Sequence, residues 1–185
     1  MSDEQLVMSC KRGERHAMEQ LVEKYYLPLK AFFWKLTCNT AVSEDLTHNV
    51  LVKIIQSIEK YHVIFGVKFS TWLFKIAYNE YLNHVQRNPS VKEVGFDESI
   101  QLNTDYSDIC ETVENMLLRQ TLRIKLKQLP EDMKTLITMR YYSGFSYQEI
   151  ASITGMHYGK VKWKLHDALE KLKNTMKAVE GGKDA

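Results

Sequence analysis

The sequence predicts an all-α protein of two small helical domains joined by a flexible acidic linker, with a helix-turn-helix in the C-terminal domain. Apolar residues recur at helical spacing, and no alternating strand pattern competes with them. Net charge is unevenly divided along the 185 residues: residues 1–87 carry +2, 88–115 carry −6 and 116–185 carry +6. A glycine turn separates two helical patterns within residues 146–173, as in a helix-turn-helix.

The domain boundaries follow from these changes in composition. Asn88-Pro89 ends the helical pattern of the first domain, because proline disfavours helix in its predecessor. The acidic stretch that follows has only isolated apolar residues, which is typical of a segment ordered only against a partner. The predicted parts are the first domain, 1–87, the linker, 88–112, the second domain, 113–178, and a polar tail, 179–185.

Four helices are predicted in the first domain, at about residues 3–11, 15–36, 43–61 and 70–87. Ser43 and Ser70 are the expected N-caps of the third and fourth, because a serine hydroxyl can accept a free backbone N–H. Pro28 lies within the second helical pattern and is expected to kink or split it.

The second domain is predicted to begin with a helix at 112–128, and a further helix follows Leu129-Pro130. Ser146 and Glu149 then form a capping box, and Gly155 can adopt the left-handed conformation that stops a helix. A longer helix begins near His157 with a basic and aromatic outer face, which could enter the DNA major groove. The alternative interpretation is a packed helical hairpin with a solvated lysine face.

Residues 60–87 form a second candidate surface, in which aromatic residues are interspersed with basic residues. This pattern suits unpaired nucleobases, which stack on rings while cations follow the phosphates. The competing interpretation places Phe69, Trp72 and their apolar neighbours in the core. The candidates for an exposed face are Tyr61, Lys68, Ser70, Asn79, His84 and Arg87.

Signatures of other protein classes are missing from the sequence. The six histidines lack metal-ligand spacing, and there is no phosphate-binding glycine loop or nucleophile elbow, so we expect no enzyme, metal, cofactor or small-molecule substrate. Cys10, Cys38 and Cys110 are odd in number and far apart, which favours reduced thiols. With neither a signal-peptide pattern nor an apolar run of about 20 residues, the expected location is cytoplasmic.

These motifs, in this order, resemble the extracytoplasmic-function (group four) sigma factors of bacterial RNA polymerase over nearly the whole chain. The resemblance rests on several stretches: Gly13, Ala17, Leu21 and Tyr25; Ser43-Glu44-Asp45-Leu46; the string from Lys68 to Asn79; Leu129-Pro130; the string from Tyr147 to Ala151; Gly155; and Val161-Lys162.

The resemblance implies a role for each surface, with core RNA polymerase and promoter DNA as partners and a membrane-anchored anti-sigma factor as regulator. The residues implied in core-polymerase binding are Glu44, Asp45 and His48. Those implied in opening the minus-ten element are Lys60, Tyr61, Lys68, Ser70, Asn79, His84 and Arg87. Those implied in reading the minus-thirty-five duplex are Tyr158, Lys160, Lys162, Trp163, Lys164 and His166. The 25-residue linker spans up to ~85 Å when extended, enough for two elements ~70 Å apart.

The chain also departs from the family pattern. His48 and Asn49 stand where glutamine and an acid are common, and Lys160 replaces a common threonine. Asp167 and Leu169 stand where the reading helix usually has arginines, which should weaken phosphate contact. An adaptor that binds polymerase or an anti-sigma factor without reading promoters is therefore an alternative. A plain helix-turn-helix repressor would leave residues 60–87 unexplained.

Overall fold

The structure, a computed structural model, describes residues 2–61, 67–88, 126 and 128–180, with side chains described up to residue 174. All regular structure in these residues is helical, which confirms the predicted all-α class. The predicted linker, apart from residue 88, and almost all of the predicted helix at 112–128 lie outside the described residues, as does the end of the tail. The elements are α1 (Asp3–Lys11), α2 (Arg15–Thr37), α3 (Thr40–Ser57), the 3₁₀ turn η1 (Ile58–Lys60), α4 (Phe69–Arg87), α6 (Glu131–Ile137), the π-helical η3 (Thr138–Tyr142), α7 (Tyr147–Thr154) and α8 (Tyr158–Glu180).

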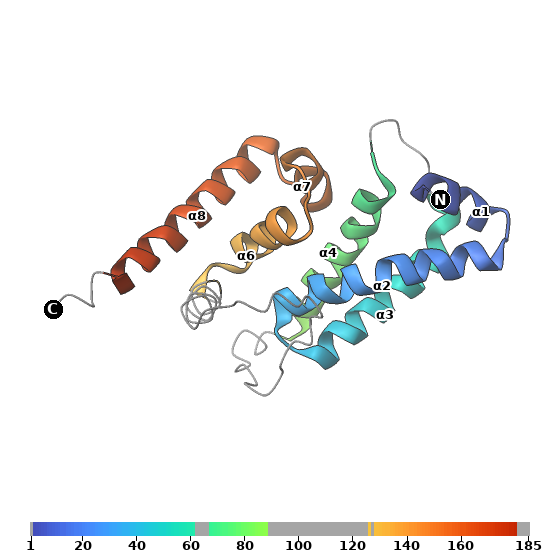
Figure 1. Cartoon of the computed structure of the whole chain (residues 1–185), viewed down its shortest axis with the longest axis horizontal. Coiled ribbons are helices and arrows are strands. Elements are labelled where there is room, and N and C mark those ends of the chain that lie inside the picture. Colours follow the sequence, from blue (N-terminus) through green and yellow to red (C-terminus); the bar gives the residue numbers. More distant parts are fainter. Residues whose placement is uncertain (1, 62–66, 89–125, 127, 181–185) are drawn as a thin grey trace, which may run out of the picture.

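Helices α1 to α4 form the N-terminal domain, in which α2 packs along α3 and α1, and α4 packs against α3 (Figure 1). Apolar residues at helical spacing on α2 and α4 meet in a core of large side chains. Phe33, Leu29, Phe69 and Leu73 are completely buried. Each contributes about 1.5–3 kcal/mol relative to an exposed side chain.

Two predicted N-caps are wrong. Helix α3 begins one turn earlier than expected, because Asn39 caps it and its Oδ1 accepts the Val42 N–H at 3.1 Å. Ser43 is buried inside α3 and donates its hydroxyl to the Thr40 carbonyl. Helix α4 begins at Phe69 after Lys68, which makes no side-chain cap, so Ser70 lies inside the first turn.

Helix α2 is continuous through Pro28, so the predicted split does not occur. Pro28 is exposed, whereas the neighbouring Leu29 and Phe32 are buried. Because proline has no N–H, the Lys24 carbonyl lacks its helical donor. On this exposed side of the helix, water can donate to that carbonyl instead. Packing of the apolar face on α3 and α1 holds the two halves of the helix together.

The C-terminal domain contains α6, η3, α7 and α8, and its helix-turn-helix forms as predicted. Ser146 and Glu149 make a reciprocal capping box, and Gly155 ends α7 with a φ of 71°. Ile150 and Val161 are completely buried, one on each helix of the motif. The apolar faces of α7 and α8 pack against each other, and α8 also packs against α6. The opposite face of α8 is exposed.

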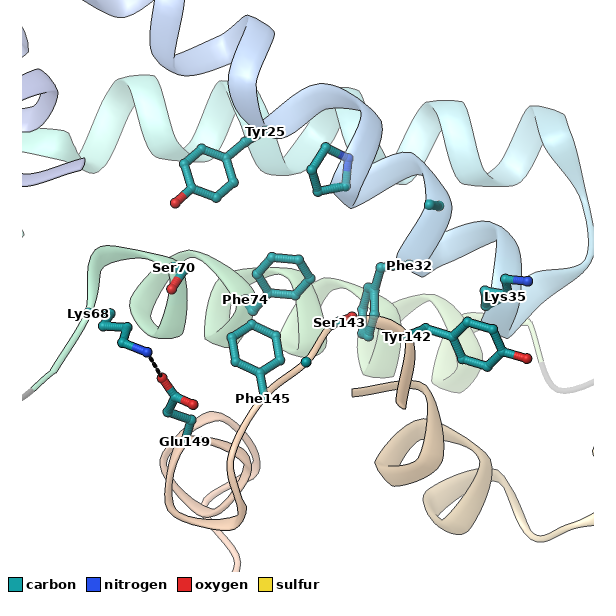
Figure 2. A pocket seen from close by; sticks show the side chains of 13 residues that line it. Tyr25, Phe32, Lys35, Lys68, Ser70, Phe74, Tyr142, Ser143, Phe145 and Glu149 are labelled. Carbon is teal, nitrogen blue, oxygen red and sulfur yellow. Dashed lines mark ion pairs between the residues drawn. The ribbon is translucent and has the colours of Figure 1, made fainter. Parts of the chain in front are cut away.

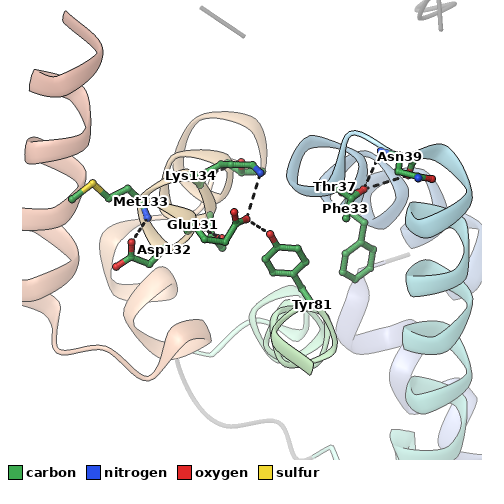
Figure 3. A network of polar contacts seen from close by, with 10 residues as sticks. Phe33, Thr37, Asn39, Tyr81, Glu131, Asp132, Met133 and Lys134 are labelled. Carbon is green, nitrogen blue, oxygen red and sulfur yellow. Dashed lines mark hydrogen bonds and ion pairs between the residues drawn. The ribbon is translucent and has the colours of Figure 1, made fainter. Parts of the chain in front are cut away.

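The two domains lie directly against each other, with α7 packed on α4 (Figure 1). Phe145 precedes α7 and places its ring edge-on against Phe74 of α4, with ring centroids 4.9 Å apart. At the far end of α4, the Tyr81 hydroxyl donates a hydrogen bond to Glu131 of α6, as Figure 3 shows. Burial, followed by the Glu131 charge, raises the pKa of Tyr81. This is a closed arrangement of the two domains.

Candidate nucleic-acid interfaces

The first candidate interface is the solvent face of α4. Lys75, Asn79 and Asn83 are exposed at intervals of four residues, whereas Leu73 and Ala77, on the opposite face of α4, are buried. The Asn79 amide makes no hydrogen bond to another residue in the described part of the chain. It therefore presents two N–H donors and a carbonyl acceptor to solvent, the groups that pair with the edge of a nucleobase.

Lys60 is exposed at the start of this interface, but Tyr61 is only 3% exposed, so the expectation that Tyr61 lies on an exposed face is wrong. Its ring packs against Phe69 and Trp72, with both centroid separations 5.2 Å. Stacking within the core removes more apolar surface from water than an exposed position would. Tyr61 therefore supports the interface from beneath.

A lysine of α1 fixes the backbone at the same point. The Lys11 ammonium donates to the carbonyls of Glu59, at 3.2 Å, and Tyr61, at 2.5 Å. These carbonyls belong to the end of η1 and the residue after it, where backbone acceptors are left without helical partners. The sequence pattern offered no signal for this contact, which joins residues about 50 positions apart.

Lys68 and Ser70 lie where α4 faces the C-terminal domain. The Lys68 ammonium is 3.0 Å from Oε1 of Glu149 on α7, and Figure 2 shows this ion pair at the edge of a cavity of about 520 Å³. Ser70 is half-buried and lines the cavity together with Phe74 and Phe145. In the closed arrangement, Lys68 is therefore partly engaged by a carboxylate.

Glu149 has two partners at once. Burial alone would raise the pKa of its carboxyl, but the Ser146 N–H and the Lys68 ammonium together hold that pKa below its usual range. The carboxylate therefore remains charged at neutral pH, and it can attract Lys68 while it caps α7.

At the C-terminal end of α4, Arg87 is exposed and His84 is half-buried. The His84 Nε2 atom is buried and has no hydrogen-bond partner in the described part of the chain. The prediction that His84 lies on an exposed face is therefore wrong for this edge of the ring.

The second candidate interface is the outer face of α8. It carries the predicted cations and aromatic rings, and Trp163 is 61% exposed. Tyr158 is 46% exposed, at the first position of the helix. The exposed members are Tyr158, Lys160, Lys162, Trp163 and His166.

Lys164 is the exception, which corrects its predicted place on the exposed face. Its ammonium forms an ion pair with Asp132 of α6, and its side chain is only 16% exposed. Burial alone would raise the pKa of Asp132, but Lys164 and nearby backbone N–H groups hold that pKa below its usual range. Lys164 therefore joins α8 to α6.

The unusual Asp167 also has a local partner. Its Oδ2 accepts from the Lys171 ammonium at 2.9 Å, one turn further along α8. This pairing reduces the repulsion that Asp167 would exert on a DNA phosphate. The four-residue spacing of Asp167 and Lys171 could have predicted this ion pair from the sequence. The residue types alone had suggested only weaker DNA contact.

The different environments of two lysines on α8 give a test. Lys162→Ala is expected to weaken duplex binding and to lower the slope of log affinity against log salt by about one unit, because an exposed cation that meets a phosphate releases about one counterion. Titration of labelled duplex at several salt concentrations measures this slope.

Lys164→Ala is the matched control, because its ammonium is already paired with Asp132. We expect this variant to change the slope by much less than Lys162→Ala. An unchanged slope in Lys162→Ala would mean that Lys162 faces solvent in the complex.

A third surface, on α3, is exposed along a single stripe. Asp45, His48, Val52 and Ile55 follow each other at intervals of three or four residues. Val52 and Ile55 are 50% and 46% exposed, although large apolar side chains usually pack inside. Sequence reasoning singled out the two polar residues and missed the apolar pair, which the spacing from Asp45 could have revealed.

Glu44 lies beside this stripe and already has a partner. Its carboxylate is 2.6 Å from the Lys30 ammonium of α2. The hydrogen bond from Lys30 holds the pKa of Glu44 below its usual range. Glu44 is therefore a half-exposed anion at the start of the α3 surface.

The departure at Asn49 has a structural reason. Its side-chain amide donates to Oε1 of Glu80 on α4 at 3.4 Å, and Lys53 pairs with the other Glu80 oxygen. Glu80 is only 8% exposed, whereas Asn49 is exposed, so a carboxylate at position 49 would place a second negative charge next to a largely buried one.

Asn49→Glu is therefore expected to lower the free energy of unfolding by about 1–3 kcal/mol, because it replaces a donor to Glu80 by a like charge. Urea denaturation at neutral pH measures the change. Asn83→Glu places the same charge on the exposed face of α4 and should change stability by less than about 0.5 kcal/mol. Equal losses would show that the Glu80 contact is not the cause.

The described residues contain no cluster of histidine, cysteine or acidic side chains that could hold a metal ion. Across the described helices, none combines the length and apolar character that crossing a membrane requires.

Comparisons with known protein families match both helical parts of the chain. Residues 21–90 match the model of Sigma-70 region 2, and residues 119–172 match that of Sigma-70, region 4. α3 and α4 lie within the first match, and the second covers α6, η3, α7 and most of α8.

Curated relatives are similar over nearly the full length. The ECF RNA polymerase sigma-E factor of Haemophilus influenzae is 29% identical, with 97% of each chain covered. The RNA polymerase sigma-H factor of Pseudomonas aeruginosa is 27% identical, with 96% of this chain and 95% of the relative covered. The ECF sigma factor SigW of Bacillus subtilis is 25% identical, with 92% of this chain and 95% of the relative covered.

Solved structures share the fold. CnrH in complex with the cytosolic domain of CnrY superposes with a TM-score of 0.70 at 18% identity, and the match covers 96% of this chain and 99% of CnrH. The sigma factor RpoE of Bartonella quintana, in complex with the anti-sigma factor NepR, gives a TM-score of 0.65 at 25% identity. That match covers 86% of this chain and 96% of RpoE.

Proposed function

This chain belongs to the extracytoplasmic-function sigma factors of bacterial RNA polymerase, and we propose that it directs the core enzyme to promoters and opens their strands, with no catalytic activity of its own. The observation that carries the proposal is that two helical domains expose two faces of different side-chain chemistry. The face of α4 around Asn79 suits an unpaired base, whereas the face of α8 suits a duplex groove.

Each domain binds one promoter element. We place the two domains at 1–87 and 113–178, on either side of the linker. Asn79, Lys60, Lys68 and Arg87, all exposed in the N-terminal domain, engage the minus-ten element. The exposed residues of α8 read the minus-thirty-five element. Trp163 and Tyr158 make apolar contacts with the DNA, in addition to the contacts that the lysines make with it. Both assignments rest on exposure and side-chain chemistry.

The α3 stripe is the proposed contact with core polymerase. It combines exposed Asp45 and His48 with apolar Val52 and Ile55. Interfaces gain affinity from apolar side chains that a partner removes from water, whereas rim charges mainly guide approach. The apolar pair extends the surface beyond the residues that the family resemblance implied.

The closed arrangement is the proposed resting form. Two promoter elements about two DNA turns apart need ~70 Å between their readers, whereas here α7 packs directly on α4. The domains must therefore separate, and Lys68 must leave Glu149, before both elements are bound. Two similar structures contain CnrY and the anti-sigma factor NepR as partners, which supports control of this chain by an anti-sigma factor. We place the chain in the cytoplasm, where a membrane-anchored anti-sigma factor could hold it.

The direct test is runoff transcription with core polymerase on fragmented genomic DNA. We expect promoter-specific transcripts that require both the chain and the core enzyme. If no genomic template yields such a transcript, the proposed function is wrong.

The second candidate is an adaptor that binds polymerase but no longer reads promoters. Asp167 and Leu169 favour it, because they replace expected cations on α8. The ion pair of Asp167 with Lys171 weakens this reason, since the added negative charge is partly neutralised. Core-polymerase binding without strand opening would support the adaptor.

A further inference from the structure

Arg140 is a cation that the proposed DNA surfaces do not use. It lies on the π-helical segment η3, and its side chain is turned toward the helix-turn-helix. Its Nη1 donates to the Phe145 carbonyl at 3.0 Å, in the turn that leads into α7. Its guanidinium also lies 4.9 Å from the centre of the Tyr147 ring. A planar guanidinium can make both contacts at once, whereas a lysine ammonium cannot reproduce that geometry.

Tyr147 continues the contact to the reading helix. It is the first residue of α7 and is half-buried, and its ring meets the Tyr158 ring edge-on, with centroids 6.3 Å apart and an interplanar angle of 80°. Tyr158 is the first residue of α8 and is 46% exposed. A reading helix of this motif contacts base edges with its N-terminal residues. The ring that Tyr147 supports therefore lies at the end of α8 that meets the bases.

We propose that Arg140 is a positioning residue for minus-thirty-five reading: it orients Tyr147, and Tyr147 orients the Tyr158 ring against one base pair of the promoter. This inference rests on the proposed function. Arg140 itself contacts no DNA, whereas the exposed part of the Tyr158 ring provides apolar contact of the kind that recognises a thymine methyl group. An oriented ring discriminates between bases because it makes that contact in one position only.

The test uses the full chain with core polymerase and the genomic promoter fragment that gives the strongest runoff transcript. Every single-base substitution across its minus-thirty-five element is compared in wild type, Arg140→Lys, Tyr158→Ala and the double variant. We expect each single variant to lose about fivefold or more of the discrimination at the same base pair. The double variant should lose no more than Tyr158→Ala alone, because Arg140 acts through Tyr158.

Two further measurements separate positioning from a general structural or electrostatic role. Arg140→Lys keeps the positive charge, so the salt dependence of promoter binding should match that of wild type. Arg12→Lys is the matched control, since Arg12 is exposed near α1 and pairs with Glu14. It should leave discrimination unchanged at every position.

Three results would overturn the inference while leaving the proposed function intact. These are additive effects in the double variant, unchanged discrimination in Arg140→Lys, and a uniform loss of transcription at all base pairs. Absence of any transcript with the wild-type chain would instead contradict the proposed function, and the inference with it.

Discussion

Phe69→Ala is expected to lower the free energy of unfolding by about 3–5 kcal/mol, because it removes a large side chain that the surroundings cannot replace. Phe69 is completely buried at the first position of α4. Its ring centroid lies 5.2 Å from that of Tyr61 and 5.7 Å from that of Tyr25. The variant would leave a cavity beneath the start of α4, which carries the proposed minus-ten residues.

Urea denaturation followed by circular dichroism measures this loss. The matched control is Tyr141→Ala, which removes an aromatic ring that is 55% exposed on η3 and should cost less than about 0.5 kcal/mol. A loss below about 1 kcal/mol in Phe69→Ala would mean that the N-terminal core is not packed around this ring.

Asn79→Ala is expected to slow promoter opening by about 5- to 150-fold, the equivalent of the 1–3 kcal/mol that one well-placed contact to a base contributes. Asn79 is exposed on α4, so its removal leaves the buried Leu73 and Ala77 in place. Binding to core polymerase should remain at the wild-type level, because the α3 stripe that we assign to it does not include Asn79.

Permanganate reactivity of unpaired thymines measures opening, and fluorescence anisotropy measures binding to core polymerase. Asn83→Ala removes a second exposed amide one turn further along α4 and tests whether the contact belongs to Asn79 alone. Equal losses of opening and polymerase binding in Asn79→Ala would show that its role is structural.

Local sequence signals predicted much of the fold. The capping box of Ser146 and Glu149 and the left-handed Gly155 appear where the sequence placed them. Each feature depends on residues within a few positions of one another, so its signal is contained in a short stretch. The caps of α3 and α4 were predicted less well, since Asn39 could cap equally and lies one turn before Ser43.

Exposure was predicted correctly for some residues of the candidate surfaces and wrongly for others. Asn79, Lys162 and Trp163 are exposed as expected, but Tyr61 is buried and Lys164 is paired with Asp132. The Lys164 pair joins residues 32 positions apart, and no periodic pattern encodes such a distance. Exposure of a polar or aromatic side chain depends on what packs over it.

By itself, the sequence determined the helical class, the helix-turn-helix and the chemical character of both proposed DNA surfaces, because these follow from periodicity, capping and residue type. Only the tertiary structure decided that Phe145 packs on Phe74, that Lys68 meets Glu149 and that Arg140 supports Tyr147. The Phe145 and Lys68 contacts join residues more than 70 positions apart, and the Arg140 contact depends on how η3 turns into α7. Such contacts form through the mutual burial of surfaces that each stretch of sequence describes only separately.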